Sequence, residues 1–275
     1  MKYHIERHTV QETLVIPLYA RKVCMDRFPD LFADKACQEL ISKIDFDFES
    51  SGKKLPLFGA LQGGIRQYDL CCEVRDYLTA HPLACVVNLG CGLDTTFSQS
   101  DNGTAKGYNL DMADVIAVRN ELLPPGEREQ NIPCDLNDVS WFEKLDFHPR
   151  DGAVFIAAGV FYYFQTEQIK DLLCIMANRF PGGRIVFDAT TPFGVRLMRK
   201  TWIKEAGIQN VSTVFCVKDA EGELPAWSED FKMVTRKKYL TGYRIPDKRW
   251  NLFIRLLFRY FDWSRLAQIV QIEFR

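Results

Sequence analysis

The feature that most constrains this chain is an alternation of short apolar runs with amphipathic segments in its central part. The predicted strands lie at 84–89, 106–111, 153–158 and 184–188, and those at 84–89 and 153–158 are apolar runs. After Thr166, an expected N-cap, apolar residues recur at the i, i+3, i+4, i+7 and i+11 positions of one helix face. Buried strands that alternate with helices of this length predict a parallel, doubly wound α/β sheet.

Residues 1–80 lack this alternation. Apolar residues there fall at mixed helical spacings, interrupted at Pro17 and Pro29, which predicts short helices. A further helical run over 65–78 is expected to begin after the Gly63-Gly64 pair.

The C-terminal part returns to a strand pattern. Residues 231–240 and 269–274 predict two more strands, and a basic, aromatic helix is expected over 249–260 between them. Such a pair closes a mostly parallel sheet with an antiparallel edge strand. The short basic run at 236–238 is expected to be a solvated strand edge.

Composition narrows the classes of function. With 35 Lys+Arg against 36 Asp+Glu, the net charge of −1 argues against a nucleic-acid partner. No apolar run reaches the roughly 18 residues of a membrane helix, so no membrane partner is expected. Nine cysteines without a CxxC pair indicate buried thiols in a reducing compartment, and hence a cytoplasmic protein. The four histidines have no metal-ligand spacing, so no metal site is expected.

The strongest local motif is Gly90-Cys91-Gly92, directly after the first apolar run. Glycines where a strand turns toward a helix let a ligand approach the backbone, although a plain tight turn has the same pattern. Asp111 ends the next predicted strand, where a carboxylate can accept hydrogen bonds from both hydroxyls of a ribose. The motif therefore predicts an adenosine-containing ligand.

Two residues after this motif distinguish between such ligands. A dinucleotide fingerprint has a third glycine where this chain has Thr95. Asp94 places a carboxylate in the turn, which opposes a diphosphate and tolerates a cation. These residues favour S-adenosylmethionine (SAM), which carries a sulfonium and no phosphate, over NAD.

Three further residues are candidates for contacts with SAM. Asp135, at the expected end of a third strand, can accept from the adenine amine while Leu136 packs on the ring; a solvated turn is the alternative. Arg66 can pair with the methionine carboxylate through its guanidinium fork, or it is a surface arginine.

Four segments together resemble the leucine carboxyl methyltransferase and tetracenomycin-type polyketide O-methyltransferase family. They are VVNLGCGLDTTF (86–97), YNLDMADVIAVR (108–119), CDLNDVSW (134–141) and FIAAGVFYYF (155–164). ETLVIPLYAR (12–21) and the region around Arg66 resemble the helical cap of that family. The resemblance implies a class I, Rossmann-like SAM-dependent methyltransferase, with a helical cap at 1–80 and a SAM-binding domain at 81–275. Within that domain, a lid or substrate insertion is expected around 190–230.

The resemblance also implies a set of cofactor-binding residues. Gly90 and Gly92 would line the methionine part of SAM, Asp111 would hold the ribose, and Asp135 with Leu136 the adenine. Cys91, Met112 and Ala158 are also expected to contact the cofactor. Arg66 would pair with the carboxylate, and Arg21 would assist from the cap. The chain departs from the family at Thr96, where Arg is usual, and at Ala158, where Glu is common.

The acceptor is less constrained. Tyr162 and Tyr163 are expected to face the substrate or else to be core aromatics, and the same alternatives hold for Phe193, Trp202, Phe215 and Trp227. An ionised carboxylate acceptor needs no base, and the predicted strand-end loops hold no histidine, so no catalytic residue is predicted. The leading hypothesis is an O-methyltransferase that acts on a small-molecule hydroxyl or carboxylate, polyketide-like or aromatic. The alternatives are a non-catalytic SAM-binding protein, a protein C-terminal carboxyl methyltransferase and an NAD-dependent oxidoreductase. The oligomeric state is not predicted.

Overall fold

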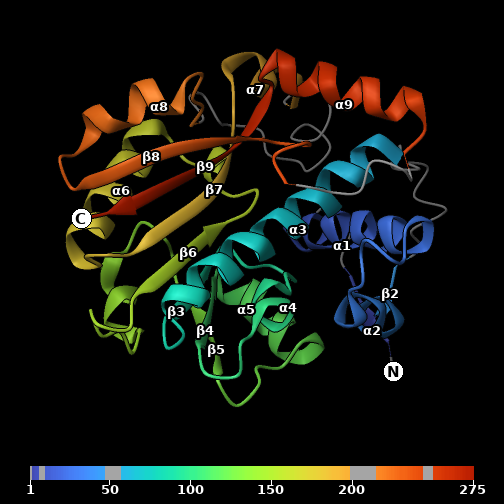
Figure 1. Cartoon of the computed structure of the whole chain (residues 1–275). Helices are drawn as coiled ribbons and strands as arrows, with labels where there is room; N and C mark the ends of the chain where they lie inside the picture. The colour runs from blue at the N-terminus through green and yellow to red at the C-terminus, as the bar shows by residue number, and fades with distance from the viewer. Residues whose placement is uncertain (1, 6–9, 47–56, 199–214, 244–249) are drawn as a thin grey trace.

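The computed structural model describes residues 2–5, 10–46, 57–198, 215–243 and 250–275 (Figure 1). Its centre is a seven-stranded sheet in the order β5-β4-β3-β6-β7-β9-β8. The strands are β3 (Cys85–Leu89), β4 (Lys106–Asp111), β5 (Glu129–Pro133), β6 (Ala153–Ala157), β7 (Arg184–Thr190), β8 (Phe231–Lys238) and β9 (Ala267–Phe274). No helix in the described ranges is long and apolar enough to cross a membrane.

Strand direction confirms the predicted class. The strands from β5 to β7 pair in parallel, whereas β9 pairs antiparallel with both β7 and β8. The chain reverses its strand order after β5, so the carboxyl ends of β3 and β6 flank a topological switch point. This is the mostly parallel class I methyltransferase sheet with an antiparallel edge.

Two apolar layers enclose the sheet. Val86, Val154 and Val186 belong to the layer that also contains α1 (Val10–Arg27) and α3 (Leu57–Ala80). The alternate positions pack with α6 (Thr166–Arg179), whose buried side chains lie on a single face. Because β3 and β6 are buried on both faces, their sequences are apolar apart from Asn88 of β3.

The N-terminal helices are longer than the sequence predicts. Helix α1 continues through Pro17, and α3 starts at Leu57 and runs through Gly63 and Gly64, so neither feature ends a helix. A Cβ on Gly63 would lie 3.0 Å from Ala20, and one on Gly64 would lie 2.5 Å from Cys24 Sγ. The glycine pair therefore allows α1 and α3 to pack closely.

The remaining elements connect these layers. They are β1 (Tyr3–His4), α2 (Lys35–Lys43), β2 (Ile44–Asp45), α4 (Thr96–Ser100), α5 (Ala113–Leu122), η1 (Val139–Lys144), η2 (Phe161–Tyr163), α7 (Pro192–Met198), α8 (Ala220–Glu223), η4 (Leu224–Trp227) and α9 (Leu252–Ser264). Strands β1 and β2 form a separate parallel pair beside α2.

Three local expectations need correction. Thr166 is the first residue of α6 and Gln165 is its N-cap, with the Gln165 N–H donating to the Gln168 side chain at 2.8 Å. Helix α9 begins at Leu252, after an Asn251 cap, and ends at Ser264. In the basic run, Lys237 is not simply solvated, because its Nζ donates to the buried carboxylate of Glu73 at 2.5 Å.

The aromatic residues expected to line an acceptor pocket lie in different places. Phe215 is buried against Phe161, Phe187 and Trp227, so Phe215 and Trp227 belong to the core. Phe193 is exposed at the start of α7. Trp202 lies outside the described residues.

Candidate active site

The backbone of the turn after β3 adopts left-handed conformations at its two glycines. Gly90 has φ +63° and Gly92 has φ +45°, values that L side chains rarely adopt. A Cβ on Gly90 would lie 2.5 Å from Val160 Cγ2, so the loop after β6 packs directly on this turn. Cys91 between them donates its N–H to Leu110 O at 3.0 Å, and burial raises the pKa of its thiol, which stays protonated.

Asp111 joins this turn to the end of β4. Its Oδ2 accepts the Gly92 N–H at 2.8 Å, and its Oδ1 accepts the Met112 N–H at 2.8 Å. Burial raises the pKa of Asp111 above its ordinary value, and the two backbone donors oppose this effect. Each carboxylate oxygen keeps a second lone pair, so Asp111 can accept two more hydrogen bonds.

The next strand contributes the residues expected near adenine. Asp135 is exposed, and its Oδ1 accepts from the backbone N–H and side-chain amide of Asn137, at 2.9 and 2.8 Å. Leu136 is buried, and Met112 at the end of β4 is 52% exposed. The backbone hydrogen bond from Cys134 N to Asp111 O, at 2.8 Å, ties the two strand ends together.

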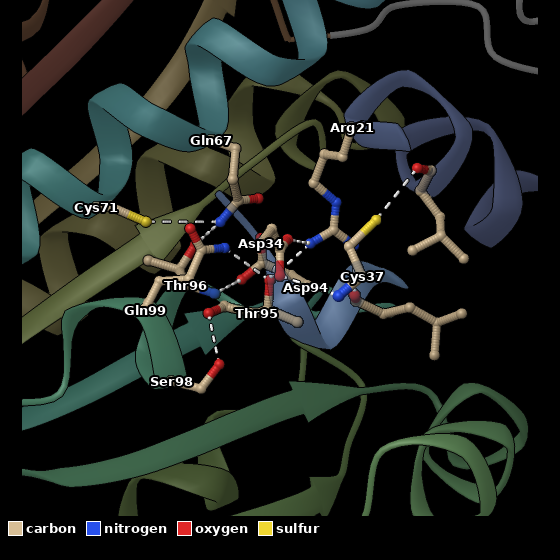
Figure 2. A network of polar contacts seen from close by, with 12 residues as sticks. Arg21, Asp34, Cys37, Gln67, Cys71, Asp94, Thr95, Thr96, Ser98 and Gln99 are labelled. Atoms are coloured by element: carbon tan, nitrogen blue, oxygen red, sulfur yellow. Dashed lines mark hydrogen bonds and ion pairs between the residues drawn. The ribbon is translucent and has the colours of Figure 1, made fainter. Parts of the chain in front are cut away.

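Arg21 of α1 holds the glycine turn from the cap side. Its Nη1 donates to Asp34 Oδ2 at 2.9 Å and to Thr95 Oγ1 at 2.7 Å, and its Nη2 donates to Leu93 O at 2.8 Å (Figure 2). Arg21 and Asp34 are both buried, and Asp34 also caps α2 by accepting the Cys37 N–H at 3.0 Å. The role of Arg21 seen here is to support the turn, and its expected contact with the cofactor stays a prediction.

The polar side chains of the turn form hydrogen bonds with neighbouring residues of the chain. Asp94 Oδ1 accepts from Asn88 Nδ2 at 2.6 Å and from the Thr96 N–H at 2.8 Å, so it fixes the turn into α4. Thr96, where the family usually has Arg, accepts a hydrogen bond from the Gln67 side chain of α3 (Figure 2). A hydroxyl and an amide thus connect two elements at this position.

Arg119 of α5 is a supporting residue that the sequence did not reveal. It is buried, and its Nη1 donates to Gly92 O at 2.9 Å and to Asp94 O at 2.8 Å. An arginine on a predicted helix has no sequence signal that distinguishes it from a surface charge.

On the other side of the turn, Arg66 pairs with Asp188 of β7. Arg66 Nη1 donates to Asp188 Oδ2 at 2.9 Å, and Asp188 Oδ1 accepts the Gly159 N–H at 2.5 Å. Burial alone would lower the pKa of Arg66, but the Asp188 carboxylate raises it above its ordinary value, so the guanidinium is charged. Asp188, like Arg119, was not predicted as a site residue.

Three tyrosines surround this ion pair. Gly159 has φ +73°, and a Cβ there would lie 2.8 Å from Tyr162 Oη and 2.9 Å from Arg66 Nη1. The rings of Tyr162 and Tyr163 are 5.0 Å apart, and Tyr239 comes from the end of β8. Burial raises the pKa of all three hydroxyls, with Arg66 opposing the shift, so they remain neutral donors. Ala158, which is half-buried, precedes Gly159 and offers no polar group.

Comparison with known proteins places this arrangement in a family. The profile of the leucine carboxyl methyltransferase family matches residues 17–177, more than half of the chain. The chain belongs to this family. The tetracenomycin polyketide synthesis O-methyltransferase TcmP of Streptomyces glaucescens is 27% identical over 199 residues, which cover 72% of each protein.

Solved structures agree on the fold. The plantazolicin methyltransferase BamL aligns with a TM-score of 0.52 at 11% identity, covering 96% of this chain and 99% of that one. The plantazolicin methyltransferase BpumL aligns with a TM-score of 0.50 at 12% identity, with the same coverage. At this identity the likeness concerns the fold, which is that of class I methyltransferases.

Family membership makes the protein a methyltransferase with S-adenosylmethionine as its cofactor. The residues present fit that molecule. Asp111 and Asp135 offer free carboxylate lone pairs for ribose hydroxyls and an adenine amine, and Leu136 with Met112 offers apolar surface for a ring. Arg66 has guanidinium N–H groups beyond the one bound to Asp188, which suit a carboxylate.

Proposed function

We propose that this protein is a SAM-dependent O-methyltransferase acting on a small molecule that carries a carboxylate or an acidic hydroxyl, with a polyketide-like or aromatic skeleton. One observation carries the proposal. In the loop after β6, Val160 packs on Gly90 of the turn that is expected to hold the cofactor. In the same loop, Gly159 donates its N–H to Asp188 and lies beside Arg66. The tyrosine cluster therefore adjoins the predicted methionine end of the cofactor.

SAM supplies a methyl group on a sulfonium, and the chain has to align the acceptor and exclude water. Positioning of this kind contributes about 7–11 kcal/mol to such a reaction. Tyr162 and Tyr163 offer neutral hydroxyl donors and ring surface, and Arg66 offers positive charge. Because no tyrosine of this cluster is ionised at neutral pH, the cluster suits an acceptor that arrives ionised rather than one that needs a strong base.

The comparison with TcmP supports O-methylation of a polyketide-like acceptor, since that relative is a polyketide synthesis O-methyltransferase. The family description favours a second candidate, a C-terminal protein carboxylate, which presents the same ionised group. Ala158, where the family often has Glu, favours the third candidate, a non-catalytic SAM-binding protein.

Incubation with methyl-labelled SAM tests these candidates. The acceptors are a panel of aromatic carboxylic acids and phenols, together with peptides that end in a free carboxylate, and product mass is the readout. Transfer to small molecules supports the proposal, with Tyr162→Phe expected to reduce turnover more than SAM binding. Transfer to the peptides alone contradicts it, and SAM binding without turnover on any acceptor favours the non-catalytic alternative.

The domain division and the location remain proposals. The division into a cap at 1–80 and a SAM-binding domain at 81–275 accords with the first strand of the main sheet starting at Cys85. All nine cysteines are free thiols, which supports a reducing, cytoplasmic compartment.

A further inference from the structure

Helix α9 has an exposed apolar face that nothing in the catalytic site uses. Among the described residues, 12 large hydrophobic side chains are exposed, and five of them lie on this helix. They are Leu252, Phe253, Leu256, Tyr260 and Trp263, each between 54% and 78% exposed. Four of them share the i, i+4, i+8 and i+11 spacing of one helix face, and Phe253 extends that face.

The opposite face of α9 is already packed. Phe258 and Phe261 lie against Phe58 of α3, with ring centroids 6.1 and 5.8 Å apart, and Phe261 is 6.0 Å from Tyr239. Asp262 is buried and accepts from Leu240 N at 3.0 Å and Thr241 Oγ1 at 2.7 Å. A helix that is apolar on both faces is normally buried on both, so the outer face needs a cover.

The size of this face indicates what could cover it. Aromatic side chains bury about 150–250 Å² each, so three aromatics and two leucines at these exposures present roughly 700 Å². The largest apolar patch of a typical monomer is about 300–600 Å², whereas each partner in a standard protein interface buries about 800 Å². Phe193 of α7, 64% exposed, adjoins the end of α9, because its neighbour Gly194 approaches Leu266 O. The face is therefore of interface size.

We infer that the outer face of α9 is a homodimer interface, covered by the same face of a second copy of this chain. The face combines Trp, Tyr and Phe with Arg255 and Arg259 at its margin, and Arg and aromatics are enriched in protein interfaces. The described part of α9 carries no exposed carboxylate, since Asp262 is buried, and no lysine. A lipid surface is disfavoured, because the protein has a net charge of −1 and the helix carries only two basic residues, Arg255 and Arg259, and no lysine.

Self-pairing requires an isologous geometry. A two-fold axis that passes near the middle of the helix, between Leu256 and Arg259, places the two copies of α9 antiparallel to each other. Trp263 of one copy then contacts Leu252 and Phe253 of the other, and the aromatic side chains of the outer face become buried between the two copies. Helix α9 lies at the edge of the molecule, away from β3 to β5, so pairing through its outer face leaves the ends of these strands outside the interface (Figure 1). Because the inner face of α9 packs on α3, dimerisation would also fix the cap.

Sedimentation equilibrium over a range of protein concentrations tests the inference on the full chain. The expected mass is twice 31.8 kDa, with a Leu256→Gln/Trp263→Gln variant shifted toward monomer by about tenfold or more in the dissociation constant. Leu83→Gln is the matched control, because Leu83 and Leu256 are both 54% exposed and only Leu256 lies on α9. Circular dichroism confirms that the variants fold.

A monomer at all concentrations overturns the inference, as does a dimer that the α9 variant leaves unchanged. Flotation with vesicles of anionic lipid is run in parallel. A monomeric protein that binds those vesicles through α9 would assign the face to a membrane surface and contradict the homodimer.

Discussion

The most informative single change is Asp111→Asn. It removes the negative charge from the group expected to accept both ribose hydroxyls, while keeping one oxygen for the Gly92 or Met112 N–H, both at 2.8 Å. Loss of a charge-assisted partner costs about 1–3 kcal/mol, which weakens SAM binding by about 5- to 150-fold. Isothermal titration calorimetry measures this directly.

Asp114→Asn is the matched control for this variant. The substitution of Asp114 makes the same change in net charge, but Asp114 is exposed, and its Oδ1 accepts the Val115 N–H at 2.9 Å. Binding by Asp114→Asn should therefore match the wild type. If Asp111→Asn keeps the wild-type dissociation constant, or both variants lose equally, Asp111 does not hold the ribose.

The pH dependence of binding provides a second test on Asp111. Burial raises its pKa, and the ionised form is the better acceptor for hydroxyls, so SAM affinity should fall as pH decreases. The decline should begin above the ordinary titration range of aspartate and be absent from Asp111→Asn. An identical pH profile in both proteins would contradict the assignment.

Three further changes test other parts of the structure. Arg21→Met leaves the buried Asp34 without its ion-pair partner and should lower the free energy of unfolding by about 3–5 kcal/mol in urea titrations. A loss below about 1 kcal/mol would show that the pair behaves as an exposed one. Asp69 is buried with no hydrogen-bond partner for either oxygen among the described residues, and burial, reinforced by Glu73, raises its pKa to about 9. Its carboxyl is thus protonated in the folded state but ionised in the unfolded chain over roughly pH 4–9, so wild-type stability falls as pH rises through that window. Asp69→Asn should remove this slope and be more stable at pH 8 by about 2 kcal/mol or more, at about 1.4 kcal/mol per pKa unit, and equal slopes would refute this. Gly159→Ala should lower both the rate of methyl transfer and the stability of the protein. Gly182 has φ +76° but open space around a Cβ, so Gly182→Ala should lower only the stability, by about 1–2 kcal/mol. Equal activity of the two variants would show that Gly159 is not part of the site.

Much of the sheet could be predicted from the sequence because its signal is local. The strand over 106–111 has the predicted bounds, and the strand at 153–158 differs by a single residue, since each is a short segment bounded by turn residues. The antiparallel edge was predicted from two late strand patterns, and β9 and β8 confirm it. The helical ends were harder to place. Whether Pro17 ends a helix depends on tertiary packing, which here continues α1 through it.

The site residues also divide into those with a local sequence signal and those without one. Gly90, Gly92 and Asp111 were identifiable because glycine pairs and strand-end carboxylates have meaning at fixed spacing, and in the structure Gly92 donates its N–H to Asp111. Asp188 and Arg119 were missed, because each acts through contacts that are distant in sequence. Asp188 is 122 residues from Arg66, and no local pattern indicates that pairing.

A crystal structure of the protein soaked with S-adenosylhomocysteine would test the central claim most directly. The ribose hydroxyls should lie within hydrogen-bond distance of Asp111, with the adenine beside Leu136 and the amino-acid carboxylate near Arg66. Density for the nucleoside anywhere else on the chain, or a saturated crystal in which Asp111 contacts only Gly92 and Met112, would contradict the account.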